Sequence, residues 1–193
     1  MKDFLKHIAD ASPGFRCYDC NDPQESMKLD VKITHKLGAP AGSKELNKIS
    51  KTIGDGATQL VEFYDKHNGI QLYCQGDAPA LEFFPVGQWR VKQNEMEQML
   101  FEPDLAFEFQ KKGTVFGEVS NSGNHLVLYQ GKVYYSNYDG GDATPVADSF
   151  FAFLTRICSN PAQLLHDLNC YTRYKDGKTN AQWIPKEYVS EMN

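Results

Sequence analysis

Two cysteines, Cys17 and Cys20, form the C-x-x-C pattern that offers the most definite chemistry in this 193-residue chain. Such a pair supplies two of the four ligands of a structural zinc site, or a redox-active dithiol. The sequence contains no second C-x-x-C and no H-x-x-x-H, so further zinc ligands are missing. Pro13 and Gly14, just before the pair, are unlike the helix start after a buried strand that a redox motif needs. We therefore expect two ordinary thiols and no bound metal.

A second candidate is the loop that holds Asn137, Asp139 and Asp142, whose side-chain oxygens could bind calcium. The calcium-loop pattern requires a Glu at a fixed distance, and here none follows at that distance, while Pro145 interrupts the segment. Asn, Asp and Gly are also the ordinary residues of turns. We interpret this segment as a turn and expect no cofactor.

Nucleophilic catalysis would require a Cys or Ser beside a His and an acid. Cys74 and Cys158 lie in apolar runs, where a thiol is usually inert. The chain has no G-x-S-x-G, no P-loop and no G-x-G-x-x-G. We expect no enzymatic activity, and keep a hydrolase with a Cys/His site as an alternative. Its histidines would come from a set of five: His7, His35, His67, His125 and His166.

Composition narrows the classes of partner. The formal net charge of −5 and the pI near 5.5 argue against a protein that binds nucleic acid, and suit a basic protein partner better. No apolar run is long enough to cross a membrane, and charges interrupt Met1 to Ile8, unlike a signal peptide. Five cysteines, an odd number in a chain of this length, favour reduced thiols. We expect a cytoplasmic protein that binds neither nucleic acid nor membrane.

The elements that must position these residues begin with an irregular stretch at 9–26. Residues 27–34 alternate between apolar and polar, as in a half-buried strand, and a Gly/Ala/Pro break precedes a helix that begins at Ser43. Apolar positions at i, i+3, i+4 and i+7 predict a helix over 57–67 that ends at Asn68-Gly69. Its core-facing residues would be Leu60, Val61, Phe63 and Tyr64. Beyond it, the sequence predicts strands at 70–74 and 80–84 and a helix at 89–100.

The segment 105–136 is rich in predicted strands, at 105–109, at 114–119 and on both sides of Gln130-Gly131. A two-residue turn at Gln130-Gly131 predicts four cross-strand pairs and two faces. The pairs are Tyr129 with Lys132, Leu128 with Val133, Val127 with Tyr134, and Leu126 with Tyr135. We assign Leu126, Leu128, Val133 and Tyr135 to the core face, and His125, Val127, Tyr129 and Tyr134 to the other face. A last amphipathic helix is predicted over 147–157, with Asp148 as its N-cap.

Two stretches together resemble the SUKH superfamily, also called the SMI-KNR family. The first is the helix end at Leu60–Gly69, LVEFYDKHNG. The second is Gly117–Leu154, which contains Gly131-Lys132-Val133-Tyr134-Tyr135, the pair Tyr138-Asp139, and the VADSF-x-x-FL helix at Val146–Leu154. Order and spacing fit as well as composition, and the resemblance covers about Ser43 to Leu165.

The resemblance implies an α+β fold in which helices pack on one mostly antiparallel sheet. Members of the family act mainly by binding proteins: bacterial members are immunity proteins that neutralise polymorphic toxins, and fungal members regulate cell-wall synthesis. No catalytic residue comes with the motif. We therefore predict a non-enzymatic protein-binding module whose partner is a cognate toxin domain or another protein. A small-ligand or peptide-binding regulator is the alternative.

Domain boundaries and a binding surface complete the prediction. We expect an N-terminal extension at 1–42 that packs on a SUKH-like domain at 43–168, and a C-terminal tail at 169–193. The predicted binding surface is the outer sheet face with Tyr129 and Tyr134, and the adjoining loop with Tyr138 and Asp139, because exposed aromatic side chains anchor interfaces. The alternative is that a helix covers the two sheet tyrosines.

Overall fold

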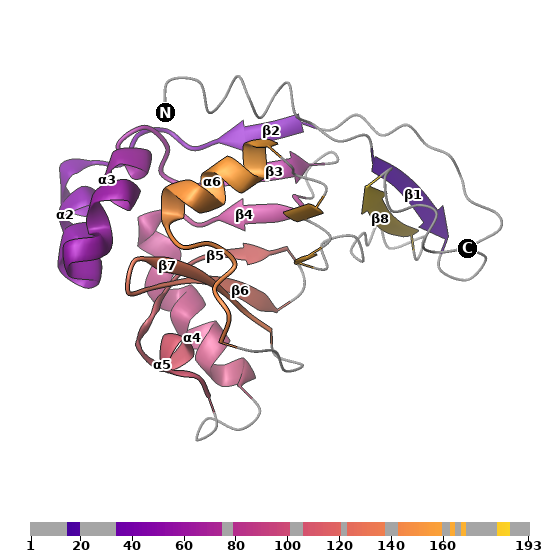
Figure 1. The fold of residues 1–193 in the computed structure, drawn as a ribbon. Coiled ribbons are helices and arrows are strands. Elements are labelled where there is room, and N and C mark those ends of the chain that lie inside the picture. The colour runs from indigo at the N-terminus through magenta and orange to yellow at the C-terminus, as the bar shows by residue number, and fades with distance from the viewer. Residues whose placement is uncertain are drawn as a thin grey trace.

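Six strands form one antiparallel sheet in the computed structural model, in the spatial order β2-β3-β4-β5-β6-β7 (Figure 1). Each strand pairs with the next one along the chain, and helices lie in the two long connections, from β2 to β3 and from β4 to β5. The strands are β2 (Thr34–Leu37), β3 (Ile70–Cys74), β4 (Leu81–Phe83), β5 (Thr114–Val119), β6 (Asn124–Tyr129) and β7 (Lys132–Ser136). A separate two-stranded sheet pairs β1 (Phe15–Asp19) with β8 (Ala181–Pro185).

The structure describes residues 15–19, 34–74, 79–100, 106–120, 123–137, 143–159, 163–164, 167–168 and 181–185, with only the backbone at 15–19, at Asp55 and at 181–185. Its helices and helical turns are α2 (Ser43–Ile53), η1 (Gly54–Ala57), α3 (Thr58–Tyr64), η2 (Val86–Gln88), α4 (Trp89–Met99), α5 (Glu108–Lys112) and α6 (Phe150–Ser159). None of the helices in these ranges is long and apolar enough to cross a membrane. The predicted α+β fold, with helices on one antiparallel sheet, is confirmed.

Helices α3 and α6 bury one face of the sheet with aromatic side chains. Phe83 of β4 lies 5.9 Å from Phe63 of α3 and 5.9 Å from Phe150 of α6, measured between ring centroids. Phe116 of β5 lies 5.5 Å from the same Phe150 at an angle of 81°, the edge-to-face geometry that aromatic pairs prefer. These rings are buried, so this face carries the main core.

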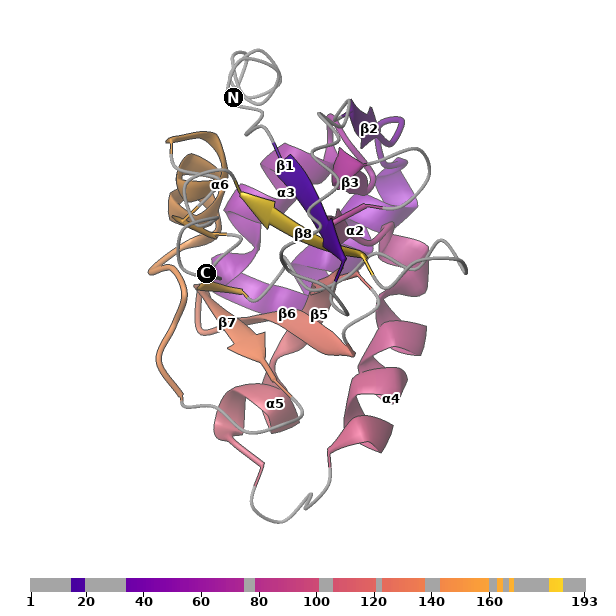
Figure 2. The same cartoon turned by 90° about the vertical axis from the view of Figure 1, so that its right-hand side faces the viewer.

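Helices α4 and α5 cover the opposite face, as Figure 2 shows by their position across the sheet from α6. The side chains of Glu118 and His125 point to this second face, because they alternate with the core residues along β5 and β6. Lys92 of α4 reaches Glu118 at 3.5 Å. Both faces of β6 are therefore buried, so His125 and Val127, expected on the face opposite the core, are covered as well.

The β6–β7 hairpin has the predicted register. Tyr129 pairs with Lys132, Leu128 with Val133, Val127 with Tyr134, and Leu126 with Tyr135. The turn residues Gln130 and Gly131 both have positive φ, 49° and 76°, as a two-residue turn that matches the strand twist requires. The strands β3 and β5 and the start of α2 at Ser43 are also confirmed, and α4 ends one residue before the predicted end.

The predicted strand at 105–109 is wrong, because residues 108–112 form the helix α5. Gln110 explains the difference: its Oε1 accepts a hydrogen bond from the N–H of Phe107 at 2.8 Å, which closes the first turn. Phe107 and Phe109, which would share one face of a strand, are therefore one exposed and one buried ring.

Three smaller differences concern the ends of elements. The helix predicted over 57–67 is shorter, since α3 covers only Thr58–Tyr64 and follows the turn η1. Ser149 and not Asp148 caps α6, because the Oγ of Ser149 accepts the N–H of Ala152 at 3.0 Å. The strand predicted at 27–34 lies outside the described residues except for its last residue, Thr34, where β2 begins.

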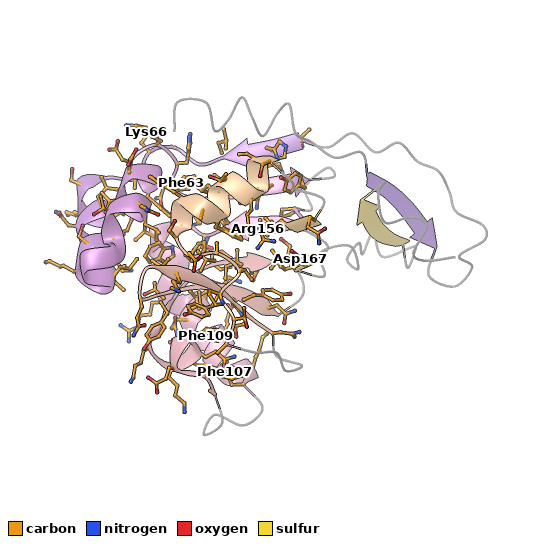
Figure 3. All side chains as sticks on the ribbon, viewed as in Figure 1. Phe63, Lys66, Phe107, Phe109, Arg156 and Asp167 are labelled. Atoms are coloured by element: carbon orange, nitrogen blue, oxygen red, sulfur yellow. The ribbon has the colours of Figure 1, made fainter. Side chains whose placement is uncertain are left out.

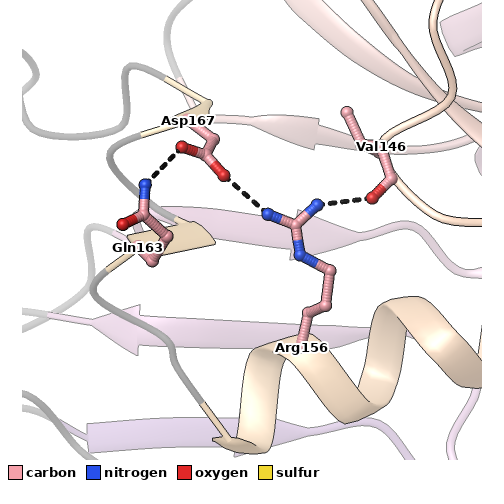
Figure 4. A network of polar contacts seen from close by, with 4 residues as sticks. All are labelled: Val146, Arg156, Gln163 and Asp167. Atoms are coloured by element: carbon pink, nitrogen blue, oxygen red, sulfur yellow. Dashed lines mark hydrogen bonds and ion pairs between the residues drawn. The ribbon is translucent and has the colours of Figure 1, made fainter.

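A cluster around Arg156 ties together the segments before and after α6 (Figure 4). The Arg156 guanidinium donates to the Val146 carbonyl before the helix and to the Asp167 carboxylate after it, at 2.5 and 2.6 Å. Gln163 donates to the other oxygen of Asp167 at 2.6 Å. The buried side chains of Leu164 and Leu168 are held against the core by this network.

Candidate functional site

Four aromatic rings follow one another on the face of the sheet that α5 covers, and we call them the aromatic strip. Phe107 stacks on Phe109 with ring centroids 5.7 Å apart, and Phe109 stacks on Tyr134 at 4.7 Å, both at interplanar angles of 10°. Tyr129 continues the series 6.2 Å from Tyr134, tilted by 57°. The strip therefore joins α5, β7 and β6, and Figure 3 shows Phe107 and Phe109 on α5.

The sheet and α5 position the strip together. Tyr129 and Tyr134 share the face that the hairpin register predicts. Helix α5 can lie directly on β6 because Gly113 at its end has no side chain: a Cβ there would lie 2.3 Å from both the Phe109 carbonyl oxygen and a Val127 methyl group. The close approach of α5 then puts Phe109 on the ring of Tyr134.

The strip is partly covered and partly open. Phe109 is buried, Tyr129 and Tyr134 are half-buried, and Phe107 is 37% exposed. Helix α5 thus covers one face of Tyr134, while Phe107 and Tyr129 remain accessible at the two ends. The other two residues of the predicted surface, Tyr138 and Asp139, lie outside the described residues.

A surface hollow of about 610 Å³ adjoins the strip at Tyr129. The β6–β7 hairpin forms one wall, and the end of α2 with the turn η1 forms the opposite wall. The lining residues are Thr52, Ile53, Gly56, Lys112, Thr114, Leu128, Tyr129, Gln130 and Gly131. A partner that contacts Tyr129 can therefore also insert a side chain between the hairpin and α2.

The charges next to the strip are paired and exposed. Lys112 forms an ion pair with Glu108 at 2.5 Å, and Lys132 forms one with Asp148 at 3.2 Å. The hydrogen bond within the first pair raises the pKa of Lys112 and lowers the pKa of Glu108, so both stay ionised at neutral pH. Exposed pairs of this kind contribute little to stability.

A row of polar side chains crosses the same face of the sheet beneath α4. It includes Glu82, Glu118 and His125 from neighbouring strands, and His125 is only 1% exposed. Burial is the main cause that lowers the pKa of His125 to about 4, and Lys92 contributes in the same direction. Burial also raises the pKa of Glu118, against the opposing effect of Lys92. Neither imidazole nitrogen of His125 has a hydrogen-bond partner of normal geometry among the described residues.

The residues proposed for other chemistry lie apart from the strip. Neither Cys74 nor Cys158 forms a disulfide within the described ranges. Burial raises the pKa of the Cys158 thiol, which disfavours the nucleophilic thiolate. The part of the chain that the structure describes holds no group of three His, Cys, Asp or Glu side chains suited to a metal ion, and Cys20, Asp139 and Asp142 lie outside it.

Sequence reasoning identified two of the four rings and missed Phe107 and Phe109, because both were assigned to a strand. The available signal was Gln110, three residues after Phe107, which is the spacing of a capping box. The signal is weak, since Phe is not among the residues that usually cap a helix.

Comparison with known proteins supplies the classification. A family model described as the SMI1 / KNR4 family (SUKH-1) matches residues 58–156, from the start of α3 into α6. No curated protein matches the chain. The match spans about half of the 193 residues and contains β3 to β7 as well as Tyr129 and Tyr134. The chain belongs to the SMI1/KNR4 family, SUKH-1.

Proposed function

We propose that this protein is a non-enzymatic, cytoplasmic immunity protein that binds a cognate toxin domain and blocks its active site. Family membership supports a role of the immunity type. The aromatic strip supports protein binding, because half-exposed aromatic side chains on a rigid scaffold are the residues that anchor interfaces. The raised pKa of Cys158 is unfavourable for a cysteine hydrolase.

The strip is the observation that carries the proposal of a binding surface. Phe107, at 37% exposure, is one of only four large apolar side chains that are exposed within the described residues. The inner rings, Phe109 and Tyr134, contact the accessible rings of Phe107 and Tyr129 and keep them in place. An incoming partner therefore does not have to order the accessible rings. Preorganised contact area of this kind lowers the entropic cost of association.

The toxin-protection assay tests the function directly. The candidate toxin would be a secreted protein with a C-terminal toxic domain encoded beside this chain, and where one is found that domain is expressed in a bacterial host with and without the protein. We expect co-expression to restore growth, and we expect the purified proteins to form a complex. Growth inhibition that persists at full expression of this chain, with no complex detected, contradicts the proposal.

Two variants locate the surface. Phe107→Ala and Tyr129→Ala each remove an accessible ring, and we expect each to weaken binding by about tenfold or more. Met99→Ala is the matched control, because Met99 is 47% exposed but lies on α4, outside the strip. Tyr134→Ala is less suitable, since the loss of its stacking on Phe109 also destabilises the fold. Unchanged affinity in both ring variants would show that the partner binds elsewhere.

A further inference from the structure

Three lysines share one exposed face of α2, and we call them the lysine strip. Lys44, Lys48 and Lys51 are spaced i, i+4 and i+7, which places them along one side of a helix. All three are exposed. Among the residues that the structure describes, none of the three forms an ion pair, and Lys48 donates one long hydrogen bond to the Val86 carbonyl at 3.4 Å.

The local physics of the first two turns of α2 opposes this arrangement, whereas the helix dipole favours Lys51 in the last turn. Like charges three and four residues apart repel each other on a helix. Lys44 also lies in the first turn, where the helix dipole favours acidic side chains. The one acid of α2, Glu45, is used elsewhere: its two oxygens accept hydrogen bonds from the N–H of Gly42 and from the amide of Asn68, both at 2.8 Å.

Four lysines outside α2 have acidic partners. Lys66, Lys92, Lys112 and Lys132 each lie within ion-pair distance of a carboxylate. The chain carries more acids than bases, with a net charge of −5, so acids were available to pair with α2 as well. A row of cations with no ion pair among the described residues, in a protein with more acids than bases, breaks a local rule of stability, and such breaks occur at functional surfaces.

The lysine strip lies next to the proposed binding surface. Thr52 and Ile53, which directly follow Lys51, form the wall of the hollow that faces Tyr129. Figure 1 shows α2 at the edge of the molecule with its neighbour α3 between it and α6. One partner can therefore cover the aromatic strip, fill the hollow and contact the lysines in a continuous interface.

We propose that the lysine strip docks an acidic segment of the protein partner. The seven-residue spacing from Lys44 to Lys51 spans about 10 Å along the helix, the length of a short acidic helix or loop. The net negative charge of the chain repels extended polyanions such as nucleic acid or an anionic membrane, which reach beyond the lysine strip, whereas a short acidic segment meets the strip alone. In addition, the rings of the aromatic strip stack on one another, which leaves few ring faces for bases. The inference rests on the proposed function in one respect: the partner is a protein.

The charge of the partner follows from this assignment. The acidic composition of the chain favours a basic partner in general, but the lysine strip itself is a positive stretch of the surface. The partner surface that meets α2 should therefore carry Asp and Glu next to an apolar patch that meets Tyr129.

A labelled helical peptide of about 20 residues, built from Glu and Ala, is the probe. Its binding to the full chain is measured by fluorescence anisotropy over a range of salt concentrations. We expect salt-sensitive binding that falls about tenfold or more in the triple variant Lys44→Gln, Lys48→Gln and Lys51→Gln. Because the variant removes repulsion between lysines, we expect its melting temperature to equal or exceed that of wild type. A loss of binding would then not reflect unfolding.

The matched control removes the same charge from other places on the surface. Lys36→Gln, Arg90→Gln and Lys66→Gln alter three exposed cations on β2, on α4 and after α3. Equal loss of peptide binding in the two triple variants would overturn the proposal. Tighter binding of single-stranded DNA or of phosphatidylserine vesicles than of the peptide would overturn it as well.

A comparison with toxin binding separates the two proposals. If Tyr129→Ala loses the toxin complex while the lysine variant binds the toxin as wild type does, the lysine inference fails and the proposed function stands. If the lysine variant loses the acidic peptide but the chain neither binds nor neutralises the toxin, the proposed function fails and the acidic docking surface remains.

Discussion

His125 is the residue whose environment differs most from its sequence pattern. Alternation in β6 places it on the face opposite the main core, and α4 covers that face and leaves His125 1% exposed. The charged groups that act on it are Lys92 and Glu95 from α4, and Glu118 is its pairing neighbour on β5. Because burial favours the neutral imidazole, its pKa is lowered to about 4 from 6.5.

The lowered pKa makes stability depend on pH with a defined sign. Between pH 6.5 and pH 4 the unfolded chain binds a proton at His125 and the folded chain does not, so the free energy of unfolding falls as the pH falls. The contribution is about 3 kcal/mol across this window. Glu118 acts in the opposite direction, since its raised pKa means that acid relieves its burial cost.

His125→Leu isolates the histidine from these other groups. We expect the variant to be as stable as wild type or more stable at pH 5, and to lose most of the pH dependence between pH 6.5 and pH 4.5. Urea denaturation of both proteins at several pH values measures this. Parallel pH profiles for wild type and variant would show that His125 does not titrate in this window.

At the scale of elements, Gln110 decides that the segment after residue 107 is a helix. Its side chain accepts the Phe107 N–H at 2.8 Å and donates to the Ser136 Oγ at 2.9 Å, and it is 5% exposed. One side chain therefore closes the first turn of α5 and fastens α5 to β7. The Phe107 end of the aromatic strip depends on the same contact.

Gln110→Ala should destabilise the protein by about 1–3 kcal/mol, because it leaves a buried hydroxyl and a helix N–H without partners. We also expect the ring resonances of Phe107, Phe109 and Tyr134 to shift in NMR spectra, and toxin binding to weaken. Gln98→Ala on the exposed side of α4 is the control. Unchanged ring resonances in the Gln110 variant would mean that α5 is held by packing alone.

The pairing of strands was predictable because its determinants are local. A Gln-Gly turn between two apolar runs sets the register of β6 and β7, and positive φ at both turn residues follows from that geometry. The helix α5 was not predictable in this way, since its short amphipathic pattern has the same alternation as a strand. Its identity depends on Ser136, a residue 26 positions away that bonds to Gln110.

At the scale of the whole molecule, the chain before residue 43 contributes to the main sheet. The N–H of Gly38 donates to the Gly69 carbonyl at 2.8 Å, the N–H of Ala41 to the Tyr64 carbonyl at 2.9 Å, and the N–H of Asn68 to the Ala39 carbonyl at 2.7 Å. These bonds and the strand β2 connect the N-terminal side to α3 and β3. The proposed boundary between an extension and a domain at residue 43 can therefore be tested by truncation.

A fragment of residues 43–193 should be less stable than a fragment of residues 34–193, because it loses β2 and exposes the edge of β3. Exposed edges promote association, so the shorter fragment should also form oligomers at high concentration. Thermal unfolding and size-exclusion chromatography measure the two effects. Equal melting temperatures and equal elution of the two fragments would support a domain that begins at residue 43.

Local patterns in the sequence are sufficient to predict the fold class, the family and the hairpin register, and they nominate Tyr129 and Tyr134 for the candidate surface. These properties depend on apolar periodicity, turn residues and a local motif, all of which act over a few positions along the chain. The packing of distant elements adds that α4 and α5 bury the second face of the sheet, that Phe107 and Phe109 extend the strip, and that the end of α2 lines the hollow beside Tyr129. The physical reason is that burial and charge at a surface depend on which distant elements pack together, and short sequence patterns do not contain that information.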